Sequence, residues 1–291
     1  MRLYGVLGWP IGHSASPAMM NAAFEAEGRE AVYLPFAVRP ADIRAAVAGL
    51  RALGAGGFNV TIPHKQAVFE LLDEVSETAR TAGAVNTVVI GADGRLFGHN
   101  TDVDGWWASV RPHLPGAPHR VAVLGAGGAA RAVLTALSVH APGAAVSVIA
   151  RRLEQGEALA ERFSESLRVT ARAWAERHEA VAEADLVAQT TPIGMWPNHD
   201  ASAVEDPACF FPGQVVQDAV YRPLKTRLLT QAAERGATIV DGLSMLVEQG
   251  ALAYERWFDA PAPRDVMRRA AERAVGPLET PSPDATAEGA H

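Results

Sequence analysis

The sequence predicts an α/β protein made of two α/β units. Short apolar and β-branched runs alternate with alanine-rich helical runs from residue 2 to about residue 100, and again from residue 119 to residue 242. Such alternation is typical of parallel sheets covered by helices. A chain of 291 residues is long enough for two domains, although its length alone would also permit one large domain.

The first unit is expected to span residues 1–101. Its last part, "AVNTVVIGADGRLFGHN" (84–100), indicates two strands joined by a turn at Asp93 and Gly94, a pair that favours a tight hairpin. This hairpin would end the unit. The other predicted strands are 3–8, 31–38 and 57–62, and the predicted helices are 16–28, 40–54 and 64–75.

The second unit is expected over residues 102–242. Its six candidate strands match the count of a doubly wound, or Rossmann, nucleotide-binding domain. Residues 243–275 are helical in pattern, and residues 276–291 are rich in Pro, Gly, Ser and acidic side chains, which predicts a disordered tail. The six strands are predicted at 119–124, 144–150, 167–173, 184–191, 214–221 and 237–242.

The composition argues against several classes of function. The net charge is −7 and no long basic run occurs, so neither nucleic-acid binding nor a polybasic membrane patch is indicated. The single Cys209 cannot form an intrachain disulfide, and the N-terminal residues do not resemble a secretory leader. No apolar run approaches the roughly 20 residues of a membrane span. We therefore expect a cytoplasmic protein.

A glycine-rich turn in the second unit predicts a dinucleotide site. "VAVLGAGGAAR" places Gly125, Gly127 and Ala130 in the spacing G-x-G-x-x-A, after an apolar strand and before an alanine-rich helix. Gly125 permits a tight turn, and Gly127 lacks the Cβ that would block a pyrophosphate. The alternative is a glycine-rich turn without a ligand. The predicted phosphate-binding loop comprises Gly125, Ala126, Gly127, Gly128 and Ala129.

The end of the next strand favours NADP(H) over NAD(H). Sites for NAD usually place an acidic residue there to bind the ribose 2′-hydroxyl. Here the strand runs into Ala150, Arg151 and Arg152, with no acidic residue before Glu154. Paired guanidinium groups attract a 2′-phosphate, whereas a carboxylate would repel it. The alternative is that both arginines are merely solvated.

The distribution of lysine is also informative. Only Lys65 and Lys225 are lysines among the 26 basic side chains, and the other 24 are arginines. An amine can release and regain a proton, which a guanidinium does not do in proteins. Lys65, in "GFNVTIPHK", is therefore a candidate for proton chemistry, although two lysines must lie somewhere in any case.

Several motifs occur in a fixed order between about residue 5 and residue 258. They are "GWPIGHSASPAMMN", "GFNVTIPHK", "GAVNTV", "GHNTDVDG", "TTPIGM", "DAVYRPLKTRLL" and "DGLSMLVEQGALAYERW". This set resembles the shikimate dehydrogenase family. The resemblance implies NADPH-dependent reduction of 3-dehydroshikimate to shikimate in aromatic amino-acid biosynthesis. It also implies a substrate domain and a cofactor domain around a cleft, with the helices of 243–275 returning to the substrate domain.

The resemblance implies roles for residues of the first unit. Ser14 and Ser16 would bind the substrate carboxylate, and we expect Ser16 to cap a helix that Pro17 opens. Asn59 and Thr61 share one face of a strand and suit substrate hydroxyls. The family pairs Lys65 with Asp102, so that the two exchange the hydroxyl proton. Taken alone, Asp102 is equally well explained as a helix cap.

Further positions follow from the same resemblance. Three positions differ from the residues that are usual in the family: Met20, Ala150 and Arg152. The differences at Ala150 and Arg152 make it less certain that the family's contacts with the adenine side of the cofactor apply to this sequence. A relative that accepts quinate or NAD, and a catalytically silent nucleotide sensor, are the alternatives. The sequence leaves monomer and homodimer open. The remaining expected residues are Asn86, Tyr221 and Gln249 for the substrate, and Thr190, Thr191, Gly242 and Met245 for the cofactor.

Overall fold

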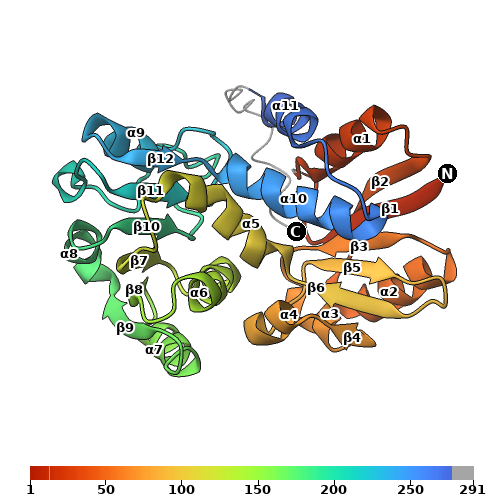
Figure 1. Cartoon of the computed structure of the whole chain (residues 1–291), viewed down its shortest axis with the longest axis horizontal. Coiled ribbons are helices and arrows are strands. Elements are labelled where there is room, and N and C mark those ends of the chain that lie inside the picture. Colours follow the sequence, from red (N-terminus) through yellow and green to blue (C-terminus); the bar gives the residue numbers. More distant parts are fainter. Residues whose placement is uncertain (13, 277–291) are drawn as a thin grey trace, which may run out of the picture.

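The fold contains two six-stranded sheets that lie side by side, each with its own helices (Figure 1). This computed structural model describes residues 1–12 and 14–276. Residues 277–291, which make up nearly all of the tail predicted to be disordered, lie outside the described residues.

The first sheet is mixed. Its strands are β1 (Arg2–Gly8), β2 (Ala31–Ala37), β3 (Gly57–Val60), β4 (Glu74–Val75), β5 (Thr87–Ile90) and β6 (Leu96–His99), in the order β2-β1-β3-β5-β6-β4. β5 and β6 are antiparallel, and Gly94 adopts φ +79° between them, which confirms the predicted hairpin. The helices of this part are α1 (Ser16–Ala26), α2 (Ile43–Ala52), α3 (Lys65–Phe69) and α4 (Glu77–Ala82).

The second sheet is parallel throughout. Its strands are β7 (Arg120–Leu124), β8 (Ala145–Ala150), β9 (Arg168–Ala173), β10 (Leu186–Gln189), β11 (Val215–Asp218) and β12 (Thr238–Val240). The order β12-β11-β10-β7-β8-β9 is that of a doubly wound sheet, so all six predicted strands are confirmed. The helices are α6 (Gly128–His140), α7 (Leu153–Arg162), α8 (Arg177–Ala182) and α9 (Arg227–Glu234).

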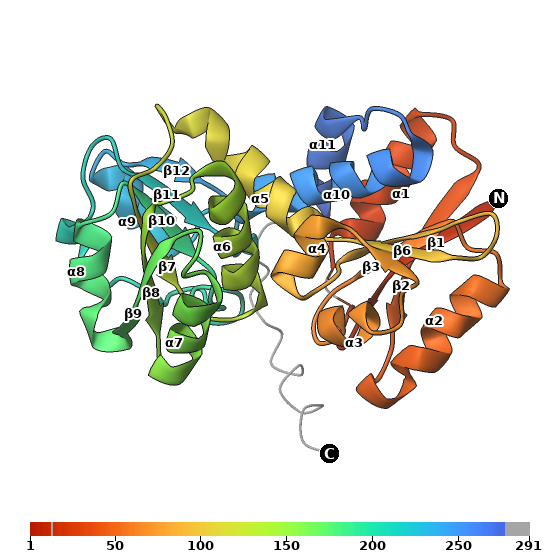
Figure 2. The same ribbon diagram turned by 60° about the horizontal axis from the view of Figure 1, so that its bottom comes forward.

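Two helices lie between the two sheets, α5 (Thr101–Val110) and α10 (Gly242–Phe258), and a third, α11 (Arg264–Val275), packs against α1 and α10. Figure 2 shows α5 and α10 between the sheets, with α11 beside α1. One buried cluster combines Tyr4 and Phe24 of the first sheet region with Leu243, Tyr254 and Met267 of the C-terminal helices. The C-terminal helices therefore return to the first sheet, as the resemblance implies.

The prediction of one helix over residues 64–75 is wrong. α3 ends at Phe69, and the chain then pairs with β6 through the short strand β4. Asp73 explains the change, because its backbone N–H donates to the carbonyl of Leu96 and its carboxylate accepts from the N–H of Leu96 at 2.8 Å. Lys65 is the first helical residue of α3, and Pro63 lies in the preceding turn.

α5 and α10 cross in very close contact at Gly105. A Cβ atom on Gly105 would lie 2.6 Å from the backbone nitrogen of Gln249 and 2.8 Å from its Cα. Real Cβ atoms do not approach backbone atoms this closely, so only glycine permits this helix crossing. Gly105 follows Asp102 by three residues and therefore lies on nearly the same side of α5.

Replacing Gly105 by alanine should destabilise the protein. We expect Gly105→Ala to lower the free energy of unfolding by about 1–3 kcal/mol, because the added methyl group must push α10 away. Gly49→Ala is the matched control: this helical glycine has no atom within 4 Å of a built Cβ, and the change should stabilise by up to about 1 kcal/mol. Urea unfolding followed by circular dichroism measures both, and equal midpoints would contradict the close crossing.

Candidate active site

A cavity of about 700 Å³ lies at the carboxyl ends of β7, β8 and β10. Open α/β sheets bind ligands at this edge, where the strand order reverses. The structure brings most of the predicted cofactor residues to this cavity. Those that line it are Gly125, Ala126, Gly127, Ala150, Arg151, Arg152, Thr190 and Thr191.

The glycine loop has the geometry of a phosphate cradle. Gly125 adopts φ +114°, a backbone conformation that residues with a side chain rarely adopt. A Cβ atom there would also lie 2.6 Å from Oγ1 of Thr190. That hydroxyl donates to the carbonyl of Leu124 at 2.7 Å, which fixes the side chain of Thr190 on the cavity wall beside Gly125. Gly127 is the N-cap of the 13-residue helix α6. The free N–H groups and the dipole at this helix start fit the negative charge of a pyrophosphate.

The charge on the cavity wall fits an additional phosphate group. Arg151 and Arg152 are both exposed and line the cavity beside Gln155. Among the described residues that line it, none carries a carboxylate. A ribose 2′-phosphate would therefore meet two guanidinium groups and no acidic side chain, which is the arrangement that favours NADP(H).

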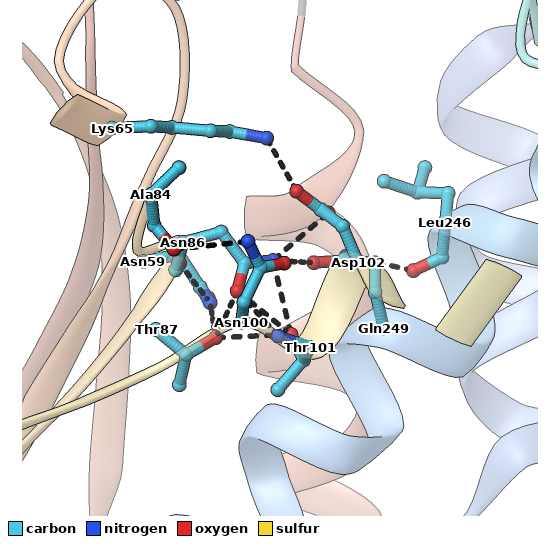
Figure 3. Close-up of polar contacts among 10 residues, drawn as sticks. All are labelled: Asn59, Lys65, Ala84, Asn86, Thr87, Asn100, Thr101, Asp102, Leu246 and Gln249. Carbon is cyan, nitrogen blue, oxygen red and sulfur yellow. Dashed lines mark hydrogen bonds and ion pairs between the residues drawn. The ribbon is translucent and has the colours of Figure 1, made fainter. Parts of the chain in front are cut away.

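A second cavity, of about 490 Å³, contains all the predicted substrate residues. It is bounded by the first sheet, by α5 and by α10, and Figure 3 shows its polar floor. Gly242 and Met245, predicted for the cofactor, line this cavity too, and so does Ala129. The predicted residues are Ser14, Ser16, Asn59, Thr61, Lys65, Asn86, Asp102, Tyr221 and Gln249.

The pair of Lys65 and Asp102 lies on the wall of this second cavity. Nζ of Lys65 donates to Oδ2 of Asp102 at 2.5 Å, and the two side chains are 26% and 14% exposed. Asp102 is in the first turn of α5, where a helix dipole favours an anion. Lys65 starts α3, where the dipole disfavours a cation, so the carboxylate compensates its charge.

Asn86 holds the carboxylate of Asp102 from behind (Figure 3). Nδ2 of Asn86 donates to Oδ1 of Asp102 at 2.9 Å and to Oε1 of Gln249 at 3.3 Å. Oδ1 of Asn86 accepts from the backbone N–H of Thr101 at 2.7 Å, which fixes the orientation of the amide. Asn86 is 2% exposed, so its contact with a ligand is confined to the edge that faces the cavity.

Asn59 is already bonded through most of its polar atoms. Its Nδ2 donates to the carbonyl of Asn86 at 3.1 Å and to Oγ1 of Thr87 at 2.9 Å, which uses both N–H groups. Its Oδ1 accepts from the hydroxyl of Tyr33 at 2.7 Å. Burial raises the pKa of Tyr33 well above the ordinary value, so the phenol remains the donor. Asn59 can therefore still accept a hydrogen bond from a ligand hydroxyl, but it has no free donor.

The predicted capping role of Ser16 is wrong. Ser16 is the first residue of α1, its N-cap is Ala15, and no side chain makes the usual cap. Instead, the hydroxyl oxygen of Ser14 accepts from the backbone N–H of Ser16 at 3.2 Å. Both serines are half-buried and line the second cavity, which leaves the hydroxyl of Ser16 available to a ligand.

Some residues do not lie where the sequence suggested, and others were missed. Gly128 starts α6 but lines neither cavity. Gln155 and Trp174 line the first cavity and were not predicted. Trp174 directly follows β9, and its place after a strand was the available signal. The buried hydroxyls of Thr87 and Thr101 were also missed, although both threonines lie inside the motifs "GAVNTV" and "GHNTDVDG".

The described residues contain no group of three or more His, Cys, Asp or Glu side chains that could hold a metal ion. Cys209 is buried, and burial raises the pKa of its thiol, which disfavours the nucleophilic thiolate. In residues 1–12 and 14–276, no helix is both long and apolar enough to cross a membrane.

Comparison with known families agrees with this geometry. Residues 6–88 match the shikimate dehydrogenase substrate binding domain, and residues 242–272 match the shikimate 5′-dehydrogenase C-terminal domain. The chain is 47% identical over 280 residues to the shikimate dehydrogenase (NADP(+)) of Symbiobacterium thermophilum, which covers 94% of this chain and 95% of that protein. The chain belongs to the shikimate dehydrogenase family. A homologue of the same name from Methanopyrus kandleri is 45% identical, over 91% of this chain and 93% of its own length.

Solved structures of shikimate dehydrogenase relatives share the fold. The shikimate 5-dehydrogenase of Thermus thermophilus, solved with NADP(H) and shikimate, superimposes with a TM-score of 0.85 at 37% identity, covering 94% of this chain and 100% of that chain. The quinate dehydrogenase of Corynebacterium glutamicum, solved with NAD, gives a TM-score of 0.85 at 35% identity, covering 92% and 98%. The fold alone therefore does not separate these two activities.

One buried carboxyl group in this shikimate dehydrogenase relative has an unusual environment. Asp218 ends β11 and is fully buried. Burial raises its pKa to about 7, although hydrogen bonds from the N–H of Val220, the hydroxyl of Thr226 and the amide of Gln189 act in the opposite direction. Asp218 thus holds the loop that carries Tyr221 into the second cavity.

Asp218 should make stability depend on pH. Its folded pKa lies above its ordinary value of 3.8, so between about pH 4 and about pH 7 the folded protein binds a proton that the unfolded chain does not. The contribution of this proton to the free energy of unfolding is fully present below about pH 4. It is lost as the pH rises to about 7, and the loss is at most about 4 kcal/mol.

Urea unfolding of the wild type and of Asp218→Asn between pH 4 and pH 8 measures this effect. We expect the wild type to lose stability relative to Asp218→Asn as the pH rises, because an amide has nearly the same shape as the carboxyl group but does not titrate. Asp200→Asn, at a carboxylate that is 96% exposed, is the control and should track the wild type. A constant difference between the wild type and Asp218→Asn at every pH would refute the raised pKa.

Proposed function

We propose that the protein is an NADP-dependent shikimate dehydrogenase that catalyses the reversible reduction of 3-dehydroshikimate to shikimate. This is a step of the shikimate pathway of aromatic amino-acid biosynthesis. The observation that carries the proposal is the ion pair of Lys65 and Asp102 in a cavity that also holds the hydroxyls of Ser14 and Ser16. The relatives named shikimate dehydrogenase (NADP(+)), at 45–47% identity, support it.

The cofactor is NADP(H), which supplies or accepts a hydride when bound. The loop from Gly125 to Ala129 and the start of α6 hold the pyrophosphate. Arg151 and Arg152 bind the 2′-phosphate through charge-assisted hydrogen bonds. Gly242 and Met245, at the start of α10, line the second cavity and would bound the nicotinamide end.

The residues of the second cavity hold the substrate and move its proton. Ser14 and Ser16 bind the carboxylate, and Asn59 accepts from a ring hydroxyl. In the oxidative direction Lys65 and Asp102 would hold the reacting hydroxyl and take its proton, and bound NADP+ would supply the acceptor for the hydride from the same carbon. An arginine at position 65 could hold the hydroxyl but could not exchange its proton. Asn86 and Gln249 keep Asp102 in place, and Thr61 and Tyr221 complete the pocket.

Each of the two sheets belongs to a domain with its own binding role. We propose that residues 1–101 form the substrate domain, completed by the helices of 243–275, and that residues 102–242 form the NADP-binding domain. The buried cluster that joins Tyr4 and Phe24 to Tyr254 and Met267 supports this grouping. Small molecules are then its partners, and a biosynthetic enzyme with one buried cysteine fits the cytoplasm.

Lys65 should be essential for turnover. With purified protein, shikimate and NADP+, we expect Lys65→Ala to lower kcat by about 10²–10⁴-fold, because general acid–base catalysis contributes this much. Absorbance at 340 nm gives the rate, and NADP+ binding measured by calorimetry should stay unchanged. Lys225→Ala removes the other lysine of the chain, which is exposed, and should keep wild-type activity.

Quinate and NAD+ separate the alternatives in the same assay. Rapid turnover of shikimate with NADP+, and little with quinate or NAD+, agrees with the proposal. Equal kcat/KM for quinate would favour the quinate dehydrogenase relative. An inactive wild type that still binds NADP+ would leave a nucleotide sensor, and a Lys65→Ala variant with full activity would exclude the proposed proton transfer.

The two arginines should set the choice of cofactor. We expect Arg151→Ala and Arg152→Ala each to raise the KM for NADP+ about 10- to 100-fold, because each removes a charge-assisted contact with the 2′-phosphate. The KM for NAD+ should hardly change. Arg235→Ala, at an exposed position just after α9, is the control. An equal rise in the KM for NADP+ and the KM for NAD+ would show that the arginines do not recognise the 2′-phosphate.

A further inference from the structure

Trp174 occupies a position on the first cavity that the described mechanism does not use. It follows the last residue of β9, and β9 pairs with β8 so that Ala173 lies beside Ala150. In parallel strands the next residues along each chain are neighbours as well. Trp174 is therefore beside Arg151 at the carboxyl edge of the sheet, and both side chains line the cavity of about 700 Å³.

The indole of Trp174 is held rigidly. The guanidinium carbon of Arg177 lies 5.5 Å from the ring centroid, and Nη1 of Arg177 donates to the carbonyl of Trp174 at 2.9 Å. Arg177 is itself fixed by Glu205, with a contact of 2.6 Å. The carboxylate of Glu176 accepts from the N–H of Ala173 at 2.8 Å, just before the tryptophan. The ring thus needs little reordering when a ligand arrives.

The indole is only half-buried. Part of it packs against the core cluster that contains Ile149 and Val181, and the rest borders the cavity next to Arg152 and Gln155. The guanidinium groups on this wall suit a phosphate, and the indole adds an apolar aromatic surface beside them. An aromatic ring that packs partly against the core and also lines a nucleotide cavity is suited to contact a base.

We propose that Trp174 binds the adenine ring of the dinucleotide through its aromatic surface, as a residue of the cofactor site. This rests on the proposed use of NADP(H). The base lies toward Trp174, the 2′-phosphate lies on Arg151 and Arg152, and the pyrophosphate continues to the glycine loop. The tryptophan recognises the part that NADP+ and NAD+ share, whereas the arginines recognise the part in which they differ.

Two substitutions at this position test the assignment. Trp174→Leu keeps an apolar side chain but removes the aromatic ring, and Trp174→Phe keeps a smaller ring. We expect Trp174→Leu to weaken binding of NADP+ and of adenosine 2′,5′-bisphosphate about ten-fold, and Trp174→Phe to stay within about three-fold of the wild type. Calorimetry with the full chain gives both affinities without turnover.

The kinetic pattern separates a base contact from general damage. Trp174→Leu should raise the KM for NADP+ and for NAD+ by the same factor, with kcat and the KM for shikimate unchanged. Trp107→Leu is the matched control: Trp107 is also half-buried and stacks on His140 at 4.8 Å, but it lines neither cavity. It should leave all cofactor affinities unchanged.

The outcomes distinguish this inference from the proposed function. A wild type that does not bind adenosine 2′,5′-bisphosphate or NADP+ contradicts the proposed cofactor itself. A wild type that binds both, with unchanged affinity in Trp174→Leu, overturns the role of Trp174 alone. Two further outcomes would overturn the role of Trp174, because neither follows from contact with adenine. One is an equal loss of NADP+ affinity in Trp174→Leu and Trp174→Phe, and the other is a change in the ratio of NADP+ affinity to NAD+ affinity.

Discussion

The close crossing of α5 and α10 is the constraint on which the active site depends. At Gly105 the backbone of α5 reaches the backbone of Gln249, and no residue with a Cβ would permit this approach. Asp102 lies one turn earlier on α5, so the crossing sets the distance between its carboxylate and the amide of Gln249. It also joins the two sheets, because α5 leads into the second sheet and α10 returns from it (Figure 1).

The polar floor of the second cavity is fixed by backbone groups rather than by the charges alone. The N–H of Thr101 and the carbonyl of Asn86 determine how the amides of Asn86 and Asn59 are turned. Thr87 links these two amides, since its hydroxyl oxygen accepts from Asn59 and lies 3.2 Å from Oδ1 of Asn86. Preorganised groups of this kind need not rearrange during the reaction, so they stabilise developing charge effectively.

Local sequence patterns predicted the fold and the phosphate loop, whereas most of the substrate residues were expected from the resemblance to a family. The strand alternation and the glycine spacing indicated the second sheet and its phosphate loop. What they missed depends on contacts between distant segments. Asp73 turns the expected helix into β4 by bonding to Leu96, and Ser14 rather than Ser16 accepts the first N–H of α1. The roles of Thr87 and Trp174 appear only when strands are placed side by side.

The start of α10 packs against the loop after β11 on the wall of the second cavity, and this packing explains why one residue there must be small. A Cβ on Gly242 would lie 2.6 Å from the carbonyl oxygens of Ala219 and Val220, so the start of α10 rests directly on the loop after β11. Asp218 holds that loop through Val220 and Thr226, while Asp241 caps α10 by accepting from the N–H of Ser244. Tyr221 and Met245 are thereby fixed on the same cavity. Hydride transfer requires the two reactants to be held in a reactive geometry, and the contacts of Asp218, Asp241 and Gly242 fix the side chains that would surround them.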